Sequence, residues 1–146
     1  MSARRKRGLN KILGSEAEKR VLDIIRGMGY DADFDHHIAD IIVNDGSGVI
    51  YVEVKSVQAH IKGREGRIHF FKTRVAPMLW KSHESDFRGV VVVEVRLDNG
   101  DLLYFSVPFE RIRLKVASRW CWSVKWTKLM ALGVEGVVLN AAHIQA

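Results

Sequence analysis

Three side chains that could act together on a phosphate lie close in the sequence, at Asp40, Glu53 and Lys55. The two acids offer the oxygen ligands that Mg²⁺ and Mn²⁺ prefer. Lys55 follows Glu53 by two residues, so both side chains would lie on the same face of an extended strand. Such a set could hold a divalent ion and stabilise negative charge on a phosphate. The alternative interpretation is the solvated polar face of an ordinary strand.

The two acids can meet if the segments that carry them pair as a β-hairpin. Two β-branched runs, residues 38–44 and 49–55, flank the turn sequence Asp-Gly-Ser-Gly, which is typical of a hairpin. A two-residue loop of type II′ at 46–47 would place Asp40 directly opposite Glu53. Opposed Cβ atoms lie about 4.5–5.5 Å apart and like charges there repel, so the pair favours a cation between them. A loop one residue earlier would make the acids diagonal neighbours instead.

A helix upstream of the hairpin brings a third acid. Ser15 and Glu18 match a capping box, a Ser followed three residues later by Glu, so we expect the helix to begin at Ser15. Glu18 lies on the flank of the apolar side, where it either caps the helix or reaches a site inside the fold. Both interpretations stay open. The apolar side is expected to consist of Ala17, Val21, Ile24, Ile25 and Met28.

The rest of the chain predicts further strands and helices in an α/β arrangement. Residues 90–95 are continuously apolar, which is typical of a strand covered on both faces, and we expect this strand to lie parallel to the second hairpin strand. Pro77 fits the first turn of a helix. The remaining expectations are a strand at 30–34, a basic loop at 56–67, an extended piece at 68–71, a helix at about 76–86, a strand at 102–107 after an Asn99-Gly100 turn, and a helix at 123–132. The order of the main elements is therefore α-β-β-β-α-β-β, with a central mixed β-sheet flanked by helices.

Composition and charge limit the classes of partner. The 146 residues are 47% hydrophobic and 27% charged, which is typical of a globular protein with its own core. No apolar stretch approaches the ~20 residues that cross a bilayer, no secretory signal follows the basic start, and the single Cys121 cannot form an internal disulfide. We therefore expect an intracellular, cytoplasmic protein that does not contact membranes.

The net charge of +6 is concentrated near the start of the chain. Residues 1–13 are expected to form a basic flexible tail ahead of a single domain at 14–146, with a core at about 14–107 and a C-terminal extension at 108–146. A second basic segment follows the hairpin, and both segments favour binding to the phosphates of a nucleic acid. The expected DNA-binding residues are Arg4, Arg5, Lys6, Arg7, Lys62, Arg64, Arg67, Lys72 and Arg74.

Two adjacent histidines, His36 and His37, precede the strand that carries Asp40. Histidines next to a metal-binding strand could be ligands. A loop histidine is more often an ordinary polar residue, and contact with a DNA backbone is a third interpretation.

The motifs resemble those of a known superfamily. Asp40 on one hairpin strand, followed by Glu53-Val54-Lys55 on the next, is similar to the PD-(D/E)XK nucleases. Residues 14–18 ahead of an amphipathic helix and Gly29-Tyr30 look like the archaeal Holliday-junction resolvases, over roughly residues 6–107. The histidine pair stands where the resolvases usually have a Gly- and Ser-containing stretch, and this puts junction specificity in question more than nuclease chemistry.

This resemblance implies a restriction-endonuclease-like core and a homodimeric endonuclease that cuts four-way DNA junctions with Mg²⁺, or Mn²⁺ as a substitute. Other nucleases of the superfamily, acting on duplex or branched DNA in restriction, repair or mobile elements, are alternatives, and a non-catalytic DNA-binding module is a further one. The implied catalytic residues are Glu18, Asp40, Glu53 and Lys55, and the implied metal ligands are Asp40, Glu53 and the backbone carbonyl of Val54, with Glu18 as a further candidate.

Overall fold

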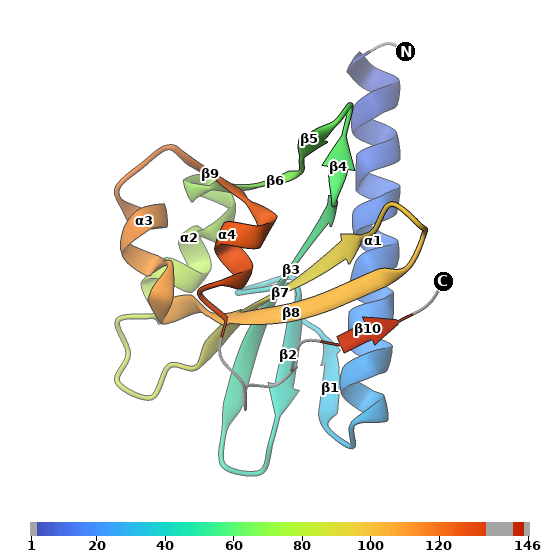
Figure 1. Ribbon diagram of the computed structural model, residues 1–146. Helices are drawn as coiled ribbons and strands as arrows, with labels where there is room; N and C mark the ends of the chain where they lie inside the picture. The colour runs from blue at the N-terminus through green and yellow to red at the C-terminus, as the bar shows by residue number, and fades with distance from the viewer. Residues whose placement is uncertain (1–2, 134–141, 145–146) are drawn as a thin grey trace.

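A mixed β-sheet forms the centre of the computed structural model, which describes the backbone of residues 3–133 and 142–144 and the side chains of residues 14–133. In this part of the chain, six strands pair in the order β1-β2-β3-β7-β8-β10 (Figure 1). Neighbouring strands are antiparallel except β3 and β7, which are parallel. The strands are β1 (Asp31–Phe34), β2 (Ile41–Asn44), β3 (Val49–Gln58), β7 (Gly89–Arg96), β8 (Leu102–Pro108) and β10 (Ala142–Ile144).

The hairpin register predicted from the sequence is confirmed for residues 41–44, but the first strand, predicted at 38–44, begins at Ile41 and leaves Asp40 just ahead of it. Ile42 pairs with Tyr51 and Asn44 with Val49, so the loop between β2 and β3 is centred on residues 46 and 47. Gly46 has φ +87°, in the left-handed region that the first central position of a type II′ turn requires. The parallel pairing of β3 with β7 is also confirmed.

Both faces of the sheet are covered by helices (Figure 1). Helix α1 (Ala3–Gly27) packs on one face, against side chains of β2, β3, β7 and β8. The other face is covered by α2 (Lys72–Lys81), the 3₁₀ turn η1 (Phe109–Arg111), α3 (Arg113–Ala117) and α4 (Trp126–Met130). Because β7 lies between these layers, Val90 to Val93 and Val95 have no exposed surface, as the continuous apolar run predicted.

The predicted start of the first helix at Ser15 is wrong, because α1 begins at Ala3. The preceding residues are mostly good helix formers without proline, so the helix continues through the basic segment and across the boundary placed at residue 14. Glu18 therefore lies inside the helix and is not a member of a capping box. Ala17, Val21 and Ile25 are buried as predicted, whereas Met28 is 48% exposed.

The segment predicted as a basic loop is instead a second, small hairpin at the end of β3. Strands β4 (His60–Ile61) and β5 (Arg64–Glu65) pair around Lys62 and Gly63, which have φ +52° and +76° as in a type I′ turn. The extended piece that follows is β6 (Arg67–Phe71), and it pairs with β9 (Cys121–Lys125).

The predicted position of the second helix is also wrong. Helix α2 begins at Lys72 and ends at Lys81, so Pro77 lies inside it. Proline removes one helical hydrogen bond and costs about 3 kcal/mol in a helix interior. Burial of Val75, Met78 and Leu79 against the sheet offsets this cost.

Residues 109–129, within the segment predicted as a C-terminal extension, contribute to the hydrophobic core. The helix predicted at 123–132 is only partly correct, because residues 121–125 form β9 and the helix α4 covers Trp126–Met130. Trp122, Trp126 and Leu129 are buried against the sheet face opposite α1. Trp126 Nε1 donates to the carbonyl of Ala59 at 3.0 Å and so holds the end of β3 next to α4. None of the helices in residues 3–133 is long and apolar enough to span a bilayer.

Candidate metal centre

Carboxylates from three elements meet at the end of the first hairpin. Glu18 comes from α1, Asp40 from the loop ahead of β2, and Glu53 from β3. Asp40 is fixed by its own hydrogen bonds, because its Oδ2 accepts the backbone N–H of Val54 at 2.8 Å and its own N–H donates to the carbonyl of Val52 at 3.1 Å. Held in this way, the Asp40 carboxyl lies close enough to Glu18 and Glu53 to raise the pKa of both.

A partly buried ion pair holds the turn of α1 that carries Glu18. Arg20 donates from Nε and Nη2 to the carboxylate of Glu94 on β7, at 2.9 and 2.8 Å, and the Tyr104 hydroxyl donates to the same carboxylate at 2.5 Å. Burial alone raises the pKa of Glu94, but these hydrogen bonds outweigh burial and hold its pKa below the ordinary value. The network fixes α1 against β7 and β8, which keeps Glu18 at the level of Asp40.

The crowding of the acids changes their proton affinities. Burial, with the neighbouring charge of Asp40, raises the pKa of Glu53 to about 8. Burial and the charge of Asp40 also raise the pKa of Glu18 to about 7, against a smaller lowering effect of His36. Both groups therefore bind protons near neutral pH, and a bound cation would take the place of those protons. This donor set fits a divalent metal ion.

A basic residue accompanies the acids on the same strand. Lys55 lies on the same face of β3 as Glu53, and its positive charge partly counteracts the rise in the pKa of Glu53. Its Nζ lies 5.2 Å from the ring centroid of Phe70, on the face of the sheet opposite α1. The structure thus brings together the acids and the lysine that the sequence singled out, while their catalytic roles and the ligand role of the Val54 carbonyl stay predictions.

The structure adds His36 to the cluster of acids, at a position that could not be predicted from the sequence. One donor atom each of Glu18, His36 and Asp40 lie within 4.8 Å of one another. The signal was present as the histidine pair ahead of Asp40, but its meaning depended on a loop conformation that no pattern of residue types predicts. His36 has φ +60°, in the left-handed backbone region that residues other than glycine seldom adopt.

The cluster opens to solvent through a cavity of about 330 Å³. Asp40, Glu53 and both histidines line it, together with Arg74 and Pro77 of α2. Arg74 is exposed and is the predicted DNA-binding residue that lies at this cavity, where it adds a positive charge beside the acids.

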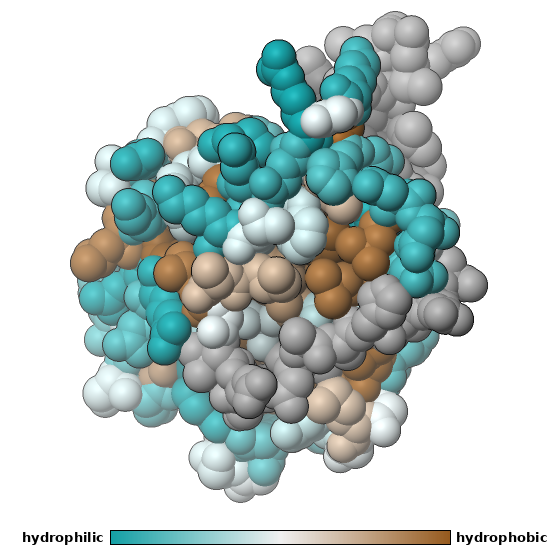
Figure 2. Space-filling view, in the orientation of Figure 1, coloured by the Kyte–Doolittle hydropathy of each residue, from teal (hydrophilic) through white to brown (hydrophobic). Residues whose placement is uncertain are grey.

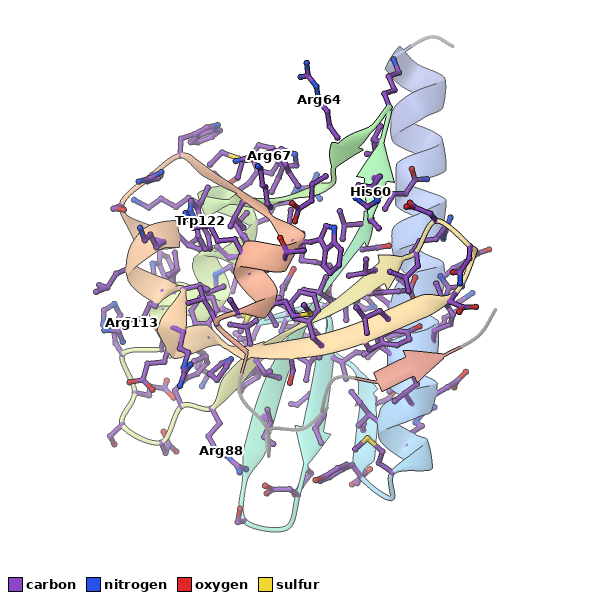
Figure 3. The ribbon with its side chains drawn as sticks, in the orientation of Figure 1. His60, Arg64, Arg67, Arg88, Arg113 and Trp122 are labelled. Carbon is purple, nitrogen blue, oxygen red and sulfur yellow. The ribbon has the colours of Figure 1, made fainter. Side chains whose placement is uncertain are left out.

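The other predicted DNA-binding residues lie at various distances from the cluster. Lys62 and Arg64 are exposed on the β4–β5 hairpin, and Arg64 points away from the body of the molecule (Figure 3). Lys72 is exposed at the start of α2. The guanidinium of Arg67 donates to the hydroxyl and carbonyl of Ser123, at 2.9 and 3.0 Å. The side chains of Arg4, Arg5, Lys6 and Arg7 lie outside the described residues.

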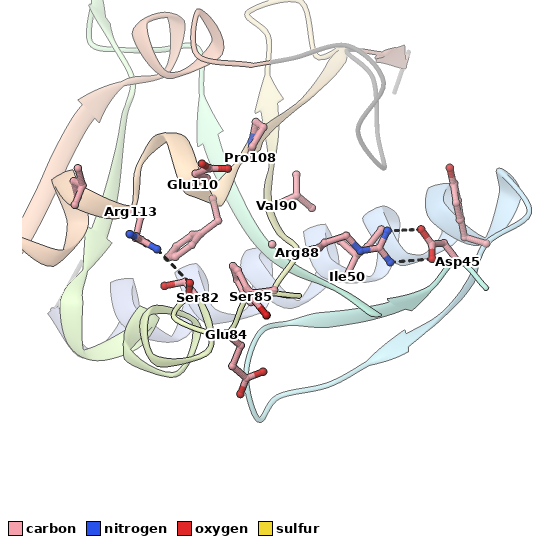
Figure 4. Close-up of a pocket in the computed structure, with 15 residues that line it drawn as sticks. Asp45, Ile50, Ser82, Glu84, Ser85, Arg88, Val90, Pro108, Glu110 and Arg113 are labelled. Carbon is pink, nitrogen blue, oxygen red and sulfur yellow. Dashed lines mark hydrogen bonds and ion pairs between the residues drawn. The ribbon is translucent and has the colours of Figure 1, made fainter. Parts of the chain in front are cut away.

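A larger cavity of about 680 Å³ lies near the turn of the first hairpin (Figure 4). Its arginines are paired with a carboxylate or with backbone. Arg88 binds the carboxylate of Asp45 at 2.6 and 2.9 Å, and Arg113 donates to the carbonyl of Ser82 at 3.2 Å. The smaller cavity, where acids crowd against one another, is therefore the stronger candidate for a metal-dependent site.

Comparison with known proteins identifies the fold. No protein-family model matches the sequence, and no curated protein matches it. Among solved structures, the chain is similar to Hjc, a Holliday junction resolvase from the archaeal hyperthermophile Archaeoglobus fulgidus. The TM-score is 0.55 at 15% sequence identity, and the match covers 84% of this chain and 91% of that chain. The two proteins share a fold. The predicted fold class, an α/β restriction-endonuclease-like core with a mixed sheet between helices, is therefore confirmed, while an identity this low leaves function to be argued from the site.

Proposed function

We propose that this protein is a metal-dependent DNA endonuclease that hydrolyses phosphodiester bonds, with four-way junctions as its preferred substrate. The observation that carries the proposal is the crowding of Glu18, Asp40 and Glu53 near Lys55, with Asp40 and Glu53 lining a solvent-accessible cavity. The fold shared with a Holliday junction resolvase supports the same conclusion. A structural ion-pair network would pair each acid with a base, whereas here the acids lie close to one another and the charge of Asp40 raises the pKa of Glu18 and Glu53.

Asp40 and Glu53 would hold Mg²⁺, or Mn²⁺ in its place, with the Val54 carbonyl and Glu18 as further ligands. When bound, the ion supplies a Lewis acid for the phosphate and lowers the pKa of a water molecule. Lys55 would stabilise the negative charge that develops on the scissile phosphate. Asp40 needs no rearrangement for its part, because its carboxylate is already held by the N–H of Val54.

DNA would be held by phosphate contacts at the cluster and on the β4–β5 hairpin. Arg74 is the nearest candidate, and Lys62 and Arg64 on the β4–β5 hairpin would contact the backbone further along. Figure 2 shows hydrophilic side chains gathered over the upper part of the molecule in this view, where β4 and β5 lie. These contacts are independent of sequence, so they would fix the position of the DNA rather than select bases.

A homodimer in the cytoplasm is the assembly that suits this function. Cutting a four-way junction symmetrically needs two cleavage sites related by a two-fold axis, and a single chain provides one such site. The C-terminal extension would act indirectly, because Trp126 and Thr127 of α4 bind the backbone of Ala59 and the side chain of Glu65 and so support the β4–β5 hairpin.

A second candidate function is a nuclease of the same fold that acts on duplex or other branched DNA. The loop of residues 35–40 favours it, because His36 and His37 stand where the resolvases usually have glycine and serine. A DNA-binding module without catalysis is a weaker candidate, because it has no need to keep a lysine beside crowded acids.

Cleavage of two labelled DNAs distinguishes these functions. The wild-type protein and Glu53→Gln would be incubated with Mg²⁺ and either a four-way junction or a linear duplex of matched sequence. Paired symmetric cuts in the junction alone, lost in Glu53→Gln, are the expected result. Cutting of both DNAs would show that the nuclease is not specific for junctions and would favour the second candidate function. Binding without cleavage, in Mn²⁺ as well as Mg²⁺, would overturn the nuclease proposal.

A further inference from the structure

We propose that His36 is a direct ligand of the same ion that Glu18 and Asp40 bind, and that this ligand makes the site prefer a transition-metal ion such as Mn²⁺ over Mg²⁺. The inference extends the proposed metal dependence of the site and does not require DNA to be the substrate. It concerns a residue outside the Asp40, Glu53 and Lys55 motif, in the loop where this chain departs from the resolvases.

The geometry permits a shared ion. The three donor atoms lie within 4.8 Å of one another. Ligands on opposite sides of an octahedral ion are about 4.2 Å apart, given metal–oxygen distances of about 2.1 Å. Adjacent ligands are about 3.0 Å apart, and among three ligands at least two of the pairs are adjacent. Rotation of the Glu18 and His36 side chains by about 1–2 Å would therefore bring all three atoms into one coordination sphere. Because the His36 side chain is exposed, an ion could reach the site from solvent.

The loop that carries His36 is held in one conformation by several hydrogen bonds. Asp35 Oδ2 accepts the N–H groups of Ile38 and Ala39, at 2.8 and 2.9 Å. The backbone of Asp35 donates to the carbonyl of Asp40 at 3.0 Å, and that of His36 donates to the carbonyl of Ala39 at 2.8 Å. These bonds close the loop and tie it to the same residue, Asp40, that supplies the central carboxylate.

The conformation of His36 itself costs free energy. A residue other than glycine at φ +60° is destabilised by on the order of 1–3 kcal/mol, and such strain persists only where the surroundings enforce it. The imidazole stacks on Phe34, with ring centroids 5.6 Å apart and planes inclined by 20°. Loop closure and stacking together hold the imidazole beside Glu18 and Asp40.

The neighbouring histidine provides a contrast within the same loop. His37 lines the cavity but is not part of the group of donor atoms around Glu18 and Asp40. The two residues share solvent exposure and position in the sequence, so a property that depends only on having a histidine in the loop would be common to both. Of the two histidines, only His36 should therefore bind the metal ion.

The chemistry of imidazole gives the expected ion preference. Mg²⁺ prefers oxygen ligands, whereas nitrogen ligands suit first-row transition metals. A site of carboxylates with one imidazole therefore gains more affinity for Mn²⁺ than for Mg²⁺ from its nitrogen ligand. Removing His36 should reduce the affinity for Mn²⁺ by about tenfold or more and the affinity for Mg²⁺ by less, since even outer-shell partners of metal ligands change affinity by about 10–100-fold.

Pulsed electron paramagnetic resonance of the full chain loaded with Mn²⁺ alone tests the assignment without using activity. We expect electron spin echo modulation from a directly bound ¹⁴N in the wild type and in His37→Asn, and its loss in His36→Asn. Asparagine is chosen because it tolerates positive φ better than most residues, so the loop should keep its shape. Thermal melting of both variants without metal would verify folding, and calorimetric titration with Mn²⁺ and with Mg²⁺ would measure the change in preference.

The possible results separate this inference from the proposed nuclease function. Bound Mn²⁺ without nitrogen modulation in the wild type, or with modulation that survives in folded His36→Asn, would overturn the inference while leaving DNA cleavage untouched. Nitrogen modulation that depends on His36, in a protein that cuts none of the DNAs, would support the inference and overturn the nuclease proposal. Absence of Mn²⁺ binding would overturn both.

Discussion

Binding of a divalent ion should release protons near neutral pH, in an amount that follows from the raised pKa values of Glu53 and Glu18. With pKa values of about 8 and about 7, Glu53 is about 90% protonated at pH 7 and Glu18 is about half protonated. If both carboxylates must ionise to accept the ion, binding of Mg²⁺ should release about 1.4 protons at pH 7 and about 0.1 at pH 9.

The same linkage sets the dependence of affinity on pH. Both pKa values are raised, so protons compete with the ion and the apparent affinity for Mg²⁺ should increase as pH rises. The increase from pH 7 to pH 9 should be about 20-fold, of which about tenfold comes from Glu53 and about twofold from Glu18. Above pH 9 the affinity should become independent of pH.

Calorimetric titration with Mg²⁺ in buffers of different ionisation enthalpy measures the number of protons released. In Glu53→Gln that number at pH 7 should fall to about 0.5 or less, because Glu18 is then the remaining raised group. Mg²⁺ that binds with no proton release at pH 7, or with an affinity that does not change between pH 7 and pH 9, would refute the assignment of these carboxylates as ligands.

The remaining predictions concern the residues around the cluster. Gly66→Ala should lower the melting temperature, because a Cβ there would lie 1.9 Å from a backbone carbonyl oxygen, whereas Gly14→Ala, in open space on α1, should raise stability by about 0.5–1 kcal/mol. Arg20→Met should reduce the free energy of unfolding by about 2–4 kcal/mol, below the range for fully buried pairs because Arg20 is 34% exposed. The pKa of Glu94 is lowered, so its contribution to stability should be present above pH 4.5 and lost at lower pH, and this loss should be smaller in Arg20→Met. Lys55→Met should slow DNA cleavage by about 10²-fold or more without weakening Mg²⁺ binding to the same extent.

Denaturant unfolding, thermal melting between pH 3 and pH 7, and single-turnover kinetics are the corresponding measurements. Equal effects of Gly66→Ala and Gly14→Ala would contradict the close packing at the second hairpin. An unchanged free energy of unfolding in Arg20→Met would show that the ion pair does not hold α1 against the sheet. A Lys55→Met protein that cleaves at the wild-type rate would exclude Lys55 from the chemistry.

The parts of the fold that the sequence predicted are those fixed by short-range patterns. Alternating and continuous apolar runs define β2, β3 and β7, and the glycine in the intervening turn sets the register of β2 against β3. The proximity of Asp40 to Glu53 could therefore be predicted from the sequence, although Asp40 lies just ahead of β2 and not, as predicted, within a strand opposite Glu53.

The parts that were mispredicted depend on tertiary packing. Pro77 was placed in the first turn of its helix on local preference, but apolar contacts of Val75 and Met78 hold it in the interior of α2. The pairing of β6 with β9 joins segments about 50 residues apart, and no local pattern specifies such a partner. The position of His36 depends on a left-handed backbone conformation that hydrogen bonds of Asp35 enforce.

Cleavage of a DNA with sulfur in place of a non-bridging oxygen at the cut phosphate is the most direct test of the central claim, that this carboxylate cluster binds a metal ion that acts on DNA. Sulfur binds Mg²⁺ poorly and softer ions better. One sulfur diastereomer should be cleaved slowly in Mg²⁺ and recover its rate in Mn²⁺, relative to unmodified DNA in each metal. If neither diastereomer is cleaved faster in Mn²⁺ than in Mg²⁺, and Asp40→Asn cuts as fast as the wild type, the claim that a metal ion in this cluster acts on DNA is contradicted.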